Sequence, residues 1–146
     1  MITGEFFSNR LVRHMEDYGY RDKVKLVSDN SVDLLGIYLT FDVGNKLPNG
    51  ERNLEIILED SGKNSEKFFS HLERIRTTKF QKENFSSNLR RKMKRDSQYL
   101  NMGNLENSDN GSYKINATLK TQNEDKAFFA LYNNLVRSLL VYSLEM

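Results

Sequence analysis

Apolar side chains near the N-terminus recur at helical spacing. They step by four, four and three residues along the chain, at Phe7, Leu11, Met15 and Tyr18. This spacing places them on one face of a helix. Gly19 follows, and glycine tolerates the left-handed conformation that often ends helices. The sequence therefore predicts an amphipathic helix that ends near Gly19.

The pattern then changes to the two-residue alternation that is typical of half-buried strands. It appears in Lys23 to Ser28 and over nine residues from Leu35 to Val43. After the turn-forming sequence GNKLPNGE, it returns at Leu54, Ile56 and Leu58. The Asn-Gly pair of that turn accepts positive φ. Residues Leu34 to Glu59 are therefore predicted to form a hairpin with one apolar face.

Helical spacing returns in the middle of the chain. One apolar stripe comprises Phe68, Phe69, Leu72 and Ile75, and a second comprises Phe85, Leu89 and Met93. On a helical wheel the two stripes are out of phase by roughly a quarter turn. This predicts a long central helix with a break or bend near Thr77 to Asn84.

The last third of the chain predicts a strand and a helix. Tyr113 to Leu119 alternates, and an Asn-Gly pair before it suits a hairpin turn. Whether residues 100–108 form the partner strand is left open by their pattern. A final helix is predicted from about Gln122, with Thr121 and Glu124 as a capping box. Its expected apolar face contains Phe128, Leu131, Leu135, Leu139 and Tyr142, and its polar face Asn133, Asn134 and Arg137.

These elements predict one α+β domain over residues 1–146. We expect an antiparallel sheet of four to five strands, with an N-terminal helix, a long or bent central basic helix and a C-terminal helix packed on it. Helices over the apolar face are the simplest way to cover so many alternating strands.

The order of elements resembles that of type III secretion chaperone-like domains. The resemblance rests on the helix LVRHMEDYGY leading into strands and on GNLENSDNGSYKINATLK before the last helix. It covers nearly the whole chain as architecture. Members of this family are typically homodimeric, non-enzymatic proteins that bind other proteins, and the resemblance implies the same here.

The composition and the absence of long apolar segments exclude several classes of protein. The 146 residues include no cysteine, which excludes disulfides, thiolate metal sites and cysteine nucleophiles. The N-terminus has no signal-peptide pattern, and the longest apolar segment, AFFALYNNLVRSLLVYSL, is interrupted by Asn and Arg. We therefore expect a core helix there rather than a membrane span, and a cytoplasmic location.

No residue pattern indicates an enzyme. His14 and His71 lie on separate predicted helices without ligand spacing, so neither metal nor cofactor is expected. Asp42, Glu55 and Glu59 lie on neighbouring strands, but the lysine of an Asp…Glu-x-Lys nuclease site is missing. Phosphate-binding glycine loops and the G-x-S-x-G motif are also absent. The sequence predicts a protein that is not an enzyme.

The segment NLRRKMKRD is the most distinctive feature. The stretch Lys63 to Arg95 contains eleven Lys or Arg and three Glu, for a net charge of +8, whereas the remaining residues carry −6. With the apolar stripe turned inward, the cations on the helix are Arg90, Arg91, Lys94 and Arg95, with Lys92 at its edge. Three interpretations remain open: a solvated helix face, a surface for nucleic acid or an acidic protein, and a membrane-surface helix, which ranks last because its apolar face is needed for the core.

We therefore expect a non-enzymatic binding protein, such as an adaptor, a chaperone-like protein or an inhibitor. The partner would be another protein or a protein–nucleic-acid complex, bound through the basic central helix. The alternative is a nucleic-acid-binding protein without sequence specificity. Small size and Asn/Lys-rich composition also suit a phage or mobile-element protein. Val141 and Leu144 lie outside the main apolar stripe, where they would either form a homodimer seam or belong to a frayed end.

Overall fold

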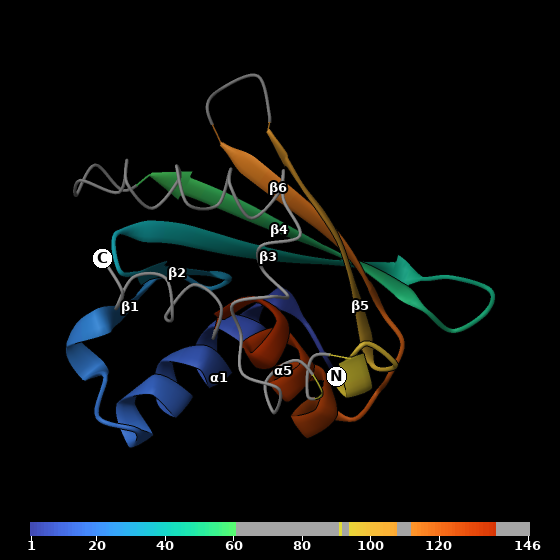
Figure 1. The fold of residues 1–146 in the computed structure, drawn as a ribbon, viewed down its shortest axis with the longest axis horizontal. Coiled ribbons are helices and arrows are strands. Elements are labelled where there is room, and N and C mark those ends of the chain that lie inside the picture. Colours follow the sequence, from blue (N-terminus) through green and yellow to red (C-terminus); the bar gives the residue numbers. More distant parts are fainter. Residues whose placement is uncertain (61–90, 92–93, 108–111, 137–146) are drawn as a thin grey trace.

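The computed structural model describes residues 1–60, 91, 94–107 and 112–136 of the 146. These residues form an antiparallel sheet with helices at both ends of the chain, which confirms the predicted α+β class (Figure 1). The helices α1 and α5 lie together against one face of the sheet, which twists strongly around them (Figure 1). No helix within the described residues is long and apolar enough to cross a membrane.

The six strands follow one another in the order β1-β2-β3-β4-β6-β5, so β1 and β5 are the edges. The bounds of the helical elements are α1 Gly4–Asp17, η1 Arg21–Lys23, α5 Glu124–Leu131 and η2 Tyr132–Val136. Those of the strands are β1 Val24–Ser28, β2 Ser31–Leu34, β3 Ile37–Lys46, β4 Arg52–Asp60, β5 Leu100–Asn107 and β6 Tyr113–Leu119.

Helix α1 is capped at both ends, and it ends where its sequence predicts. The Thr3 hydroxyl accepts a hydrogen bond from the Phe6 amide at 3.1 Å, which caps the first turn. At the other end Gly19 has a φ of +82°. Its amide donates to the carbonyl of Glu16 at 3.1 Å, and the Tyr20 amide donates to that of Met15 at 2.8 Å. This pair of bonds is a Schellman motif, which requires a left-handed residue at Gly19.

The sheet has more strands than the four to five predicted, because residues 31–34 form a separate strand, β2. The sequence pattern had placed Leu35 at the start of a long strand, but Leu35 and Gly36 form a two-residue turn with φ values of 56° and 89°. Positive φ at both positions is the type I′ geometry that matches the twist of a hairpin. The Asp33 carboxylate accepts the Gly36 amide at 3.0 Å and fixes this turn.

The core lies between the inner face of the sheet and the two helices. Strand pairing brings Phe41 opposite Ile56, and Ile56 opposite Ile115, in one row across β3, β4 and β6. All three side chains are at most 5% exposed. Phe7, Leu11 and Met15 of α1 are fully buried, as predicted, and Phe7 contacts Phe41 with ring centroids 5.9 Å apart. Tyr18, predicted on the same face, is 69% exposed because the helix ends at Asp17.

Residues 100–107, which the sequence left open, form strand β5 and pair with β6. The pairing shifts register between Met102 and Leu105. Gly103 sits at this bulge, and a Cβ there would collide with the carbonyl oxygen of Asn116. The predicted central helix falls largely outside the described residues, which include only Arg91 and a helical turn at 94–96 of it.

The C-terminal helix departs from its prediction at two points. Its cap is Asn123, whose side-chain oxygen accepts the Lys126 amide at 3.1 Å, and not the expected Thr121–Glu124 capping box. After Leu131 the backbone continues as a π-helical turn, η2. The extra residue in such a turn changes which side chains face inward. As a result Asn133, predicted on the polar face, is 7% exposed.

Candidate partner-binding surface

The best-defined cationic feature lies at the turn that enters β5. Lys94 and Arg95 are exposed, and Asp96 between them and the strand is 4% exposed. The Ser97 hydroxyl donates to the Lys94 carbonyl at 2.6 Å, and the Tyr99 amide donates to the Asp96 carbonyl at 2.9 Å. These bonds close a tight turn, so the two cations project from a fixed backbone.

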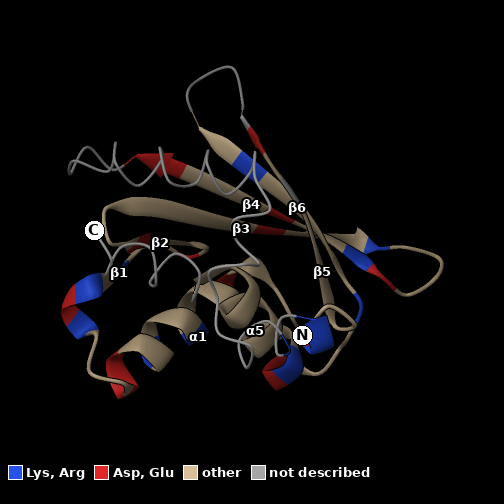
Figure 2. Ribbon diagram, viewed as in Figure 1, with Lys and Arg blue, Asp and Glu red and all other residues tan. Residues whose placement is uncertain are grey.

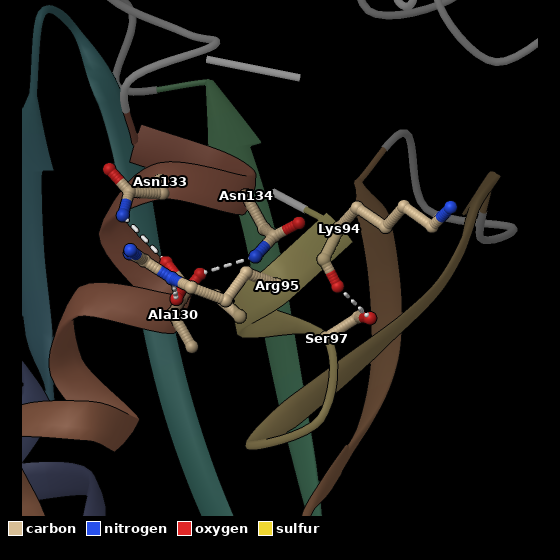
Figure 3. A network of polar contacts seen from close by, with 7 residues as sticks. Lys94, Arg95, Ser97, Ala130, Asn133 and Asn134 are labelled. Carbon is tan, nitrogen blue, oxygen red and sulfur yellow. Dashed lines mark hydrogen bonds and ion pairs between the residues drawn. The ribbon is translucent and has the colours of Figure 1, made fainter. Parts of the chain in front are cut away.

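A buried polar pair joins this turn to the C-terminal helix. The Asn133 amide donates to Oδ2 of Asp96 at 2.7 Å, and Nε of Arg95 donates to Oδ1 at 3.1 Å (Figure 3). The Asp96 side chain is 5% exposed, whereas that of Arg95 is 61% exposed. A buried carboxylate is stable only when such partners replace its water. The pair therefore fixes the position of Arg95 relative to η2.

Two further basic residues contact Tyr99, which follows the same turn. The Lys120 amide donates to the Tyr99 carbonyl at 2.8 Å, and the Lys126 ammonium lies 4.9 Å from the centroid of the Tyr99 ring. Basic residues gather at the turn before β5, after β6 and at the start of α5 (Figure 2). We define the basic surface by its exposed residues, Arg91, Lys94, Arg95, Lys120 and Lys126.

Acidic groups near the basic surface are largely engaged. Asp125, in the first turn of α5, accepts from Nη1 of Arg10 at 3.0 Å. Asp96 is buried in the pair described above, and Glu124 is exposed. Lys94 and Lys126 form no ion pair within the described part of the chain. The surface therefore presents its positive charge to solvent.

The structure places part of the predicted binding site. Arg91, Lys94 and Arg95 are exposed, as predicted for the cations of the central segment. Arg90 and Lys92 lie outside the described residues, as do Val141 and Leu144 of the proposed dimer seam. Those four residues stay predictions.

His14 lies at the edge of the apolar face of α1, inside a group of aromatic rings. Its ring centroid is 4.6 Å from those of Tyr18 and Tyr132 and 5.3 Å from that of Phe128. Burial lowers the pKa of the imidazole, the Arg10 charge lowers it further, and Asp17 partly opposes both. His14 is therefore a packing residue that favours its neutral form.

The carboxylates considered for an active site lie on the sheet face that points away from the helices. Asp42 is directly opposite Glu55, and Glu59 is opposite Tyr38. Asp42 accepts a hydrogen bond from the Asn30 side chain at 3.1 Å. Within the described residues, no group of three or more histidine or acidic side chains has the arrangement of a metal site.

Sequence reasoning missed the residues that give the basic surface its shape. Lys120 and Lys126 are isolated in the sequence. They come near the turn before β5 through Tyr99, whose carbonyl accepts the Lys120 amide and whose ring centroid lies 4.9 Å from the Lys126 ammonium. Asn133 stands beside Asn134 on the predicted polar face of its helix, so its local sequence carries no signal of burial. Its partner Asp96 lies 37 residues earlier.

No protein-family model, curated protein or solved structure matches this chain. The described residues define an α+β fold in which α1 and α5 cover one face of an antiparallel sheet, with a basic surface at one end of these helices. The resemblance to type III secretion chaperone-like domains stays a prediction.

Proposed function

We propose that this is a non-enzymatic binding protein, an adaptor, chaperone-like protein or inhibitor, that engages an acidic protein partner through the basic surface. The observation that carries the proposal is the Asp96–Asn133 pair. A turn that only needs to stay solvated requires no buried carboxylate beneath it. A turn whose cations must stand in fixed positions benefits from one, because preorganisation reduces the entropy lost on binding.

The residue types of the basic surface suit carboxylate recognition. The guanidinium of Arg95 has one donor engaged by Asp96 and presents others outward, where they can bind a carboxylate in a bidentate manner. The ammonium groups of Lys94 and Lys126 add two mobile point charges, and the Lys94 side chain is directed away from that of Arg95 (Figure 3). Such a surface raises the association rate with an acidic partner and selects against basic ones.

Nucleic acid is the second candidate, and one observation favours it. Phosphates are recognised by the same clusters of exposed Arg and Lys, which supply most of the affinity in binding without sequence specificity. The cations of the basic surface come from three separate segments, as a backbone-tracking surface requires. The Lys126 ammonium, however, lies 4.9 Å from the centroid of the Tyr99 ring and would compete with a base for that ring.

Charge reversal tests the proposal. The test variant combines Lys94→Glu, Arg95→Glu and Lys126→Glu. The matched control combines Arg21→Glu, Lys23→Glu and Lys25→Glu, which changes the net charge equally on exposed residues of η1 and β1. We expect the test variant to lose partners captured from the source cell while the control retains them. Equal capture by both variants would refute the basic surface as the binding site.

Titration with labelled single- and double-stranded DNA and RNA separates the two partners. A protein partner predicts no tight nucleic-acid binding at low or physiological salt. Nucleic acid as partner predicts affinity that falls steeply with salt, because each phosphate contact releases counterions. In that case the binding would also be lost in the Lys94, Arg95 and Lys126 variant and retained in the control.

A further inference from the structure

A pocket of about 470 Å³ lies at one end of the sheet, beside the segment that leads into α1. Its volume is within the range of small-molecule sites. The walls come from the ends of β3 and β4, from the residues before α1 and from the connection between β6 and α5. The residues that matter for its chemistry are Ile2, Lys46, Arg52, Leu119, Thr121 and Gln122.

The sheet register places two cations side by side in this pocket. Lys46 is directly opposite Arg52 across β3 and β4, and Arg52 is directly opposite Leu119 across β4 and β6. Directly opposite residues project from the same face of a sheet, and like charges in such a pair destabilise it. No acidic residue lines the pocket, and neither cation forms an ion pair within the described residues. The pair therefore lacks a counter-ion.

A hydrogen bond fixes Arg52, and Lys46 lies against the neighbouring turn. Nη1 of Arg52 donates to the carbonyl of Ile2 at 2.9 Å, which fixes the half-buried guanidinium against the segment before α1. Its other donors remain for a ligand. Lys46 lies beside the β3–β4 turn, in which the Gly50 amide donates to the Leu47 carbonyl at 2.8 Å. The Lys46 side chain packs next to Gly50, whose φ is +86°.

The remainder of the lining is apolar at its base and polar at its edge. Ile2 and Leu119 are 4% and 2% exposed, so they form a base that water reaches poorly. Thr121 and Gln122 add a hydroxyl and an amide. The geometry points to a binding site for a carboxylate joined to a compact apolar group, with Lys46 and Arg52 on the carboxylate and Ile2 and Leu119 against the apolar group. The ligand would be either a free small acid or the C-terminal residue of a polypeptide.

Three probes test this site on the full chain by isotope-edited NMR titration up to about 10 mM, the range for so small a ligand. They are 4-methylpentanoate, N-acetyl-glycyl-glycyl-leucine and the C-terminal amide of that peptide. We expect saturable shifts at Leu119 and Thr121 with one or both acids and none with the amide. Binding of 4-methylpentanoate alone identifies a small acid as the ligand, and binding of the peptide acid identifies a polypeptide C-terminus. No binding of either acid, or equal binding of the amide, would overturn the inference.

Variants locate the binding. Lys46→Gln and Arg52→Gln each remove one cation. We expect each to lower the affinity for the acid probe by about tenfold, which corresponds to the loss of one charged hydrogen bond. Lys46→Gln is the cleaner variant because its side chain is exposed, whereas Arg52→Gln also removes the bond to Ile2. Lys25→Gln on β1 removes an exposed cation outside the pocket and should leave the affinity unchanged. Unchanged affinity in both pocket variants would also overturn the inference, whatever the charge reversal at Lys94, Arg95 and Lys126 shows.

Discussion

The Asp96–Asn133 pair makes a quantitative prediction about stability. Asn133→Ala removes the amide that donates to Oδ2 of Asp96 at 2.7 Å, in a place where the Asp96 side chain is 5% exposed. Hydrogen bonds to charged groups contribute about 1.5 to 3 kcal/mol, and the carboxylate left behind has little access to water. The remaining contact to Arg95 compensates weakly, because the Arg95 side chain is 61% exposed and its ion pair is screened.

We therefore expect Asn133→Ala to lower the free energy of unfolding by about 2 to 3 kcal/mol. This is a large fraction of the total for a domain of this size. The matched control is Asn134→Ala, which has the same change in helix propensity. The Asn134 amide donates to the Ala130 carbonyl at 2.8 Å within its own helix and is half-buried. Its loss should cost less than about 1 kcal/mol.

Urea unfolding of both variants measures these differences, and a double-mutant cycle isolates the pair. Asp96→Ala alone removes the charge, and the double variant with Asn133→Ala leaves neither partner unsatisfied. We expect a coupling of about 1.5 to 3 kcal/mol between the two positions. If Asn133→Ala lost no more stability than Asn134→Ala, or if the coupling were near zero, the buried pair would not be what anchors the turn.

Three other predictions test the fold. Burial and Arg10 lower the pKa of His14 in the folded state, so the unfolded chain binds the proton more tightly and the parent protein should lose stability as pH falls below about 6.5. His14→Gln should remove this loss. A pH series of urea midpoints measures it, and equal slopes of midpoint against pH for the parent and the variant would contradict it. Gly19→Ala should cost about 1 kcal/mol from positive φ alone, since no atom outside the adjacent residues lies within 4 Å of the added Cβ. Gly44→Ala, with ordinary contacts, should change stability by less than about 0.5 kcal/mol. Similar thermal shifts for the two variants would refute the backbone argument. Gly103→Ala should cost about 2 kcal/mol because its Cβ meets a backbone carbonyl, and an unchanged melting temperature would refute this.

Periodicity predicted the elements whose burial follows a regular spacing. In α1 the buried side chains Phe7, Leu11 and Met15 keep the helical period throughout. In β3 the buried residues alternate from Ile37 to Phe41. Each of these patterns reflects one face against the core, which is the information that hydrophobic spacing carries.

Strand β2 could not be predicted because its burial does not alternate. All four residues of Ser31–Leu34 are buried, so both faces of this strand are covered. The turn that follows it also lacks the usual Asn-Gly signal. Leu35 adopts positive φ in this turn at a conformational cost of about 1 kcal/mol. Because Leu35 is apolar and continues the alternation of the next strand, the sequence pattern assigns it to that strand.

The sequence predicted the positive charge of the candidate surface but not the positions of its cations. Exposed cations at 91, 94 and 95 follow from the cost of burying charge. The position of those cations depends on Asp96, on Asn133 and on the π-helical turn that moves Asn133 inward. Local sequence does not specify that turn, because a π-helical turn holds one more residue than an α-helical turn and shifts the helical phase without a distinctive residue composition.

The basic surface and the pocket meet at the connection between β6 and α5, and this placement has a physical basis. Lys120 belongs to the surface, whereas Leu119 and Thr121 on either side of it line the pocket. Alternation along an extended chain directs successive side chains to opposite sides, so three consecutive residues can serve two sites without sharing a side chain. The same alternation keeps the sites chemically separable. Charge reversal at Lys94, Arg95 and Lys126 leaves Lys46 and Arg52 unchanged. Partner binding at the basic surface and acid binding in the pocket can therefore be lost or retained independently.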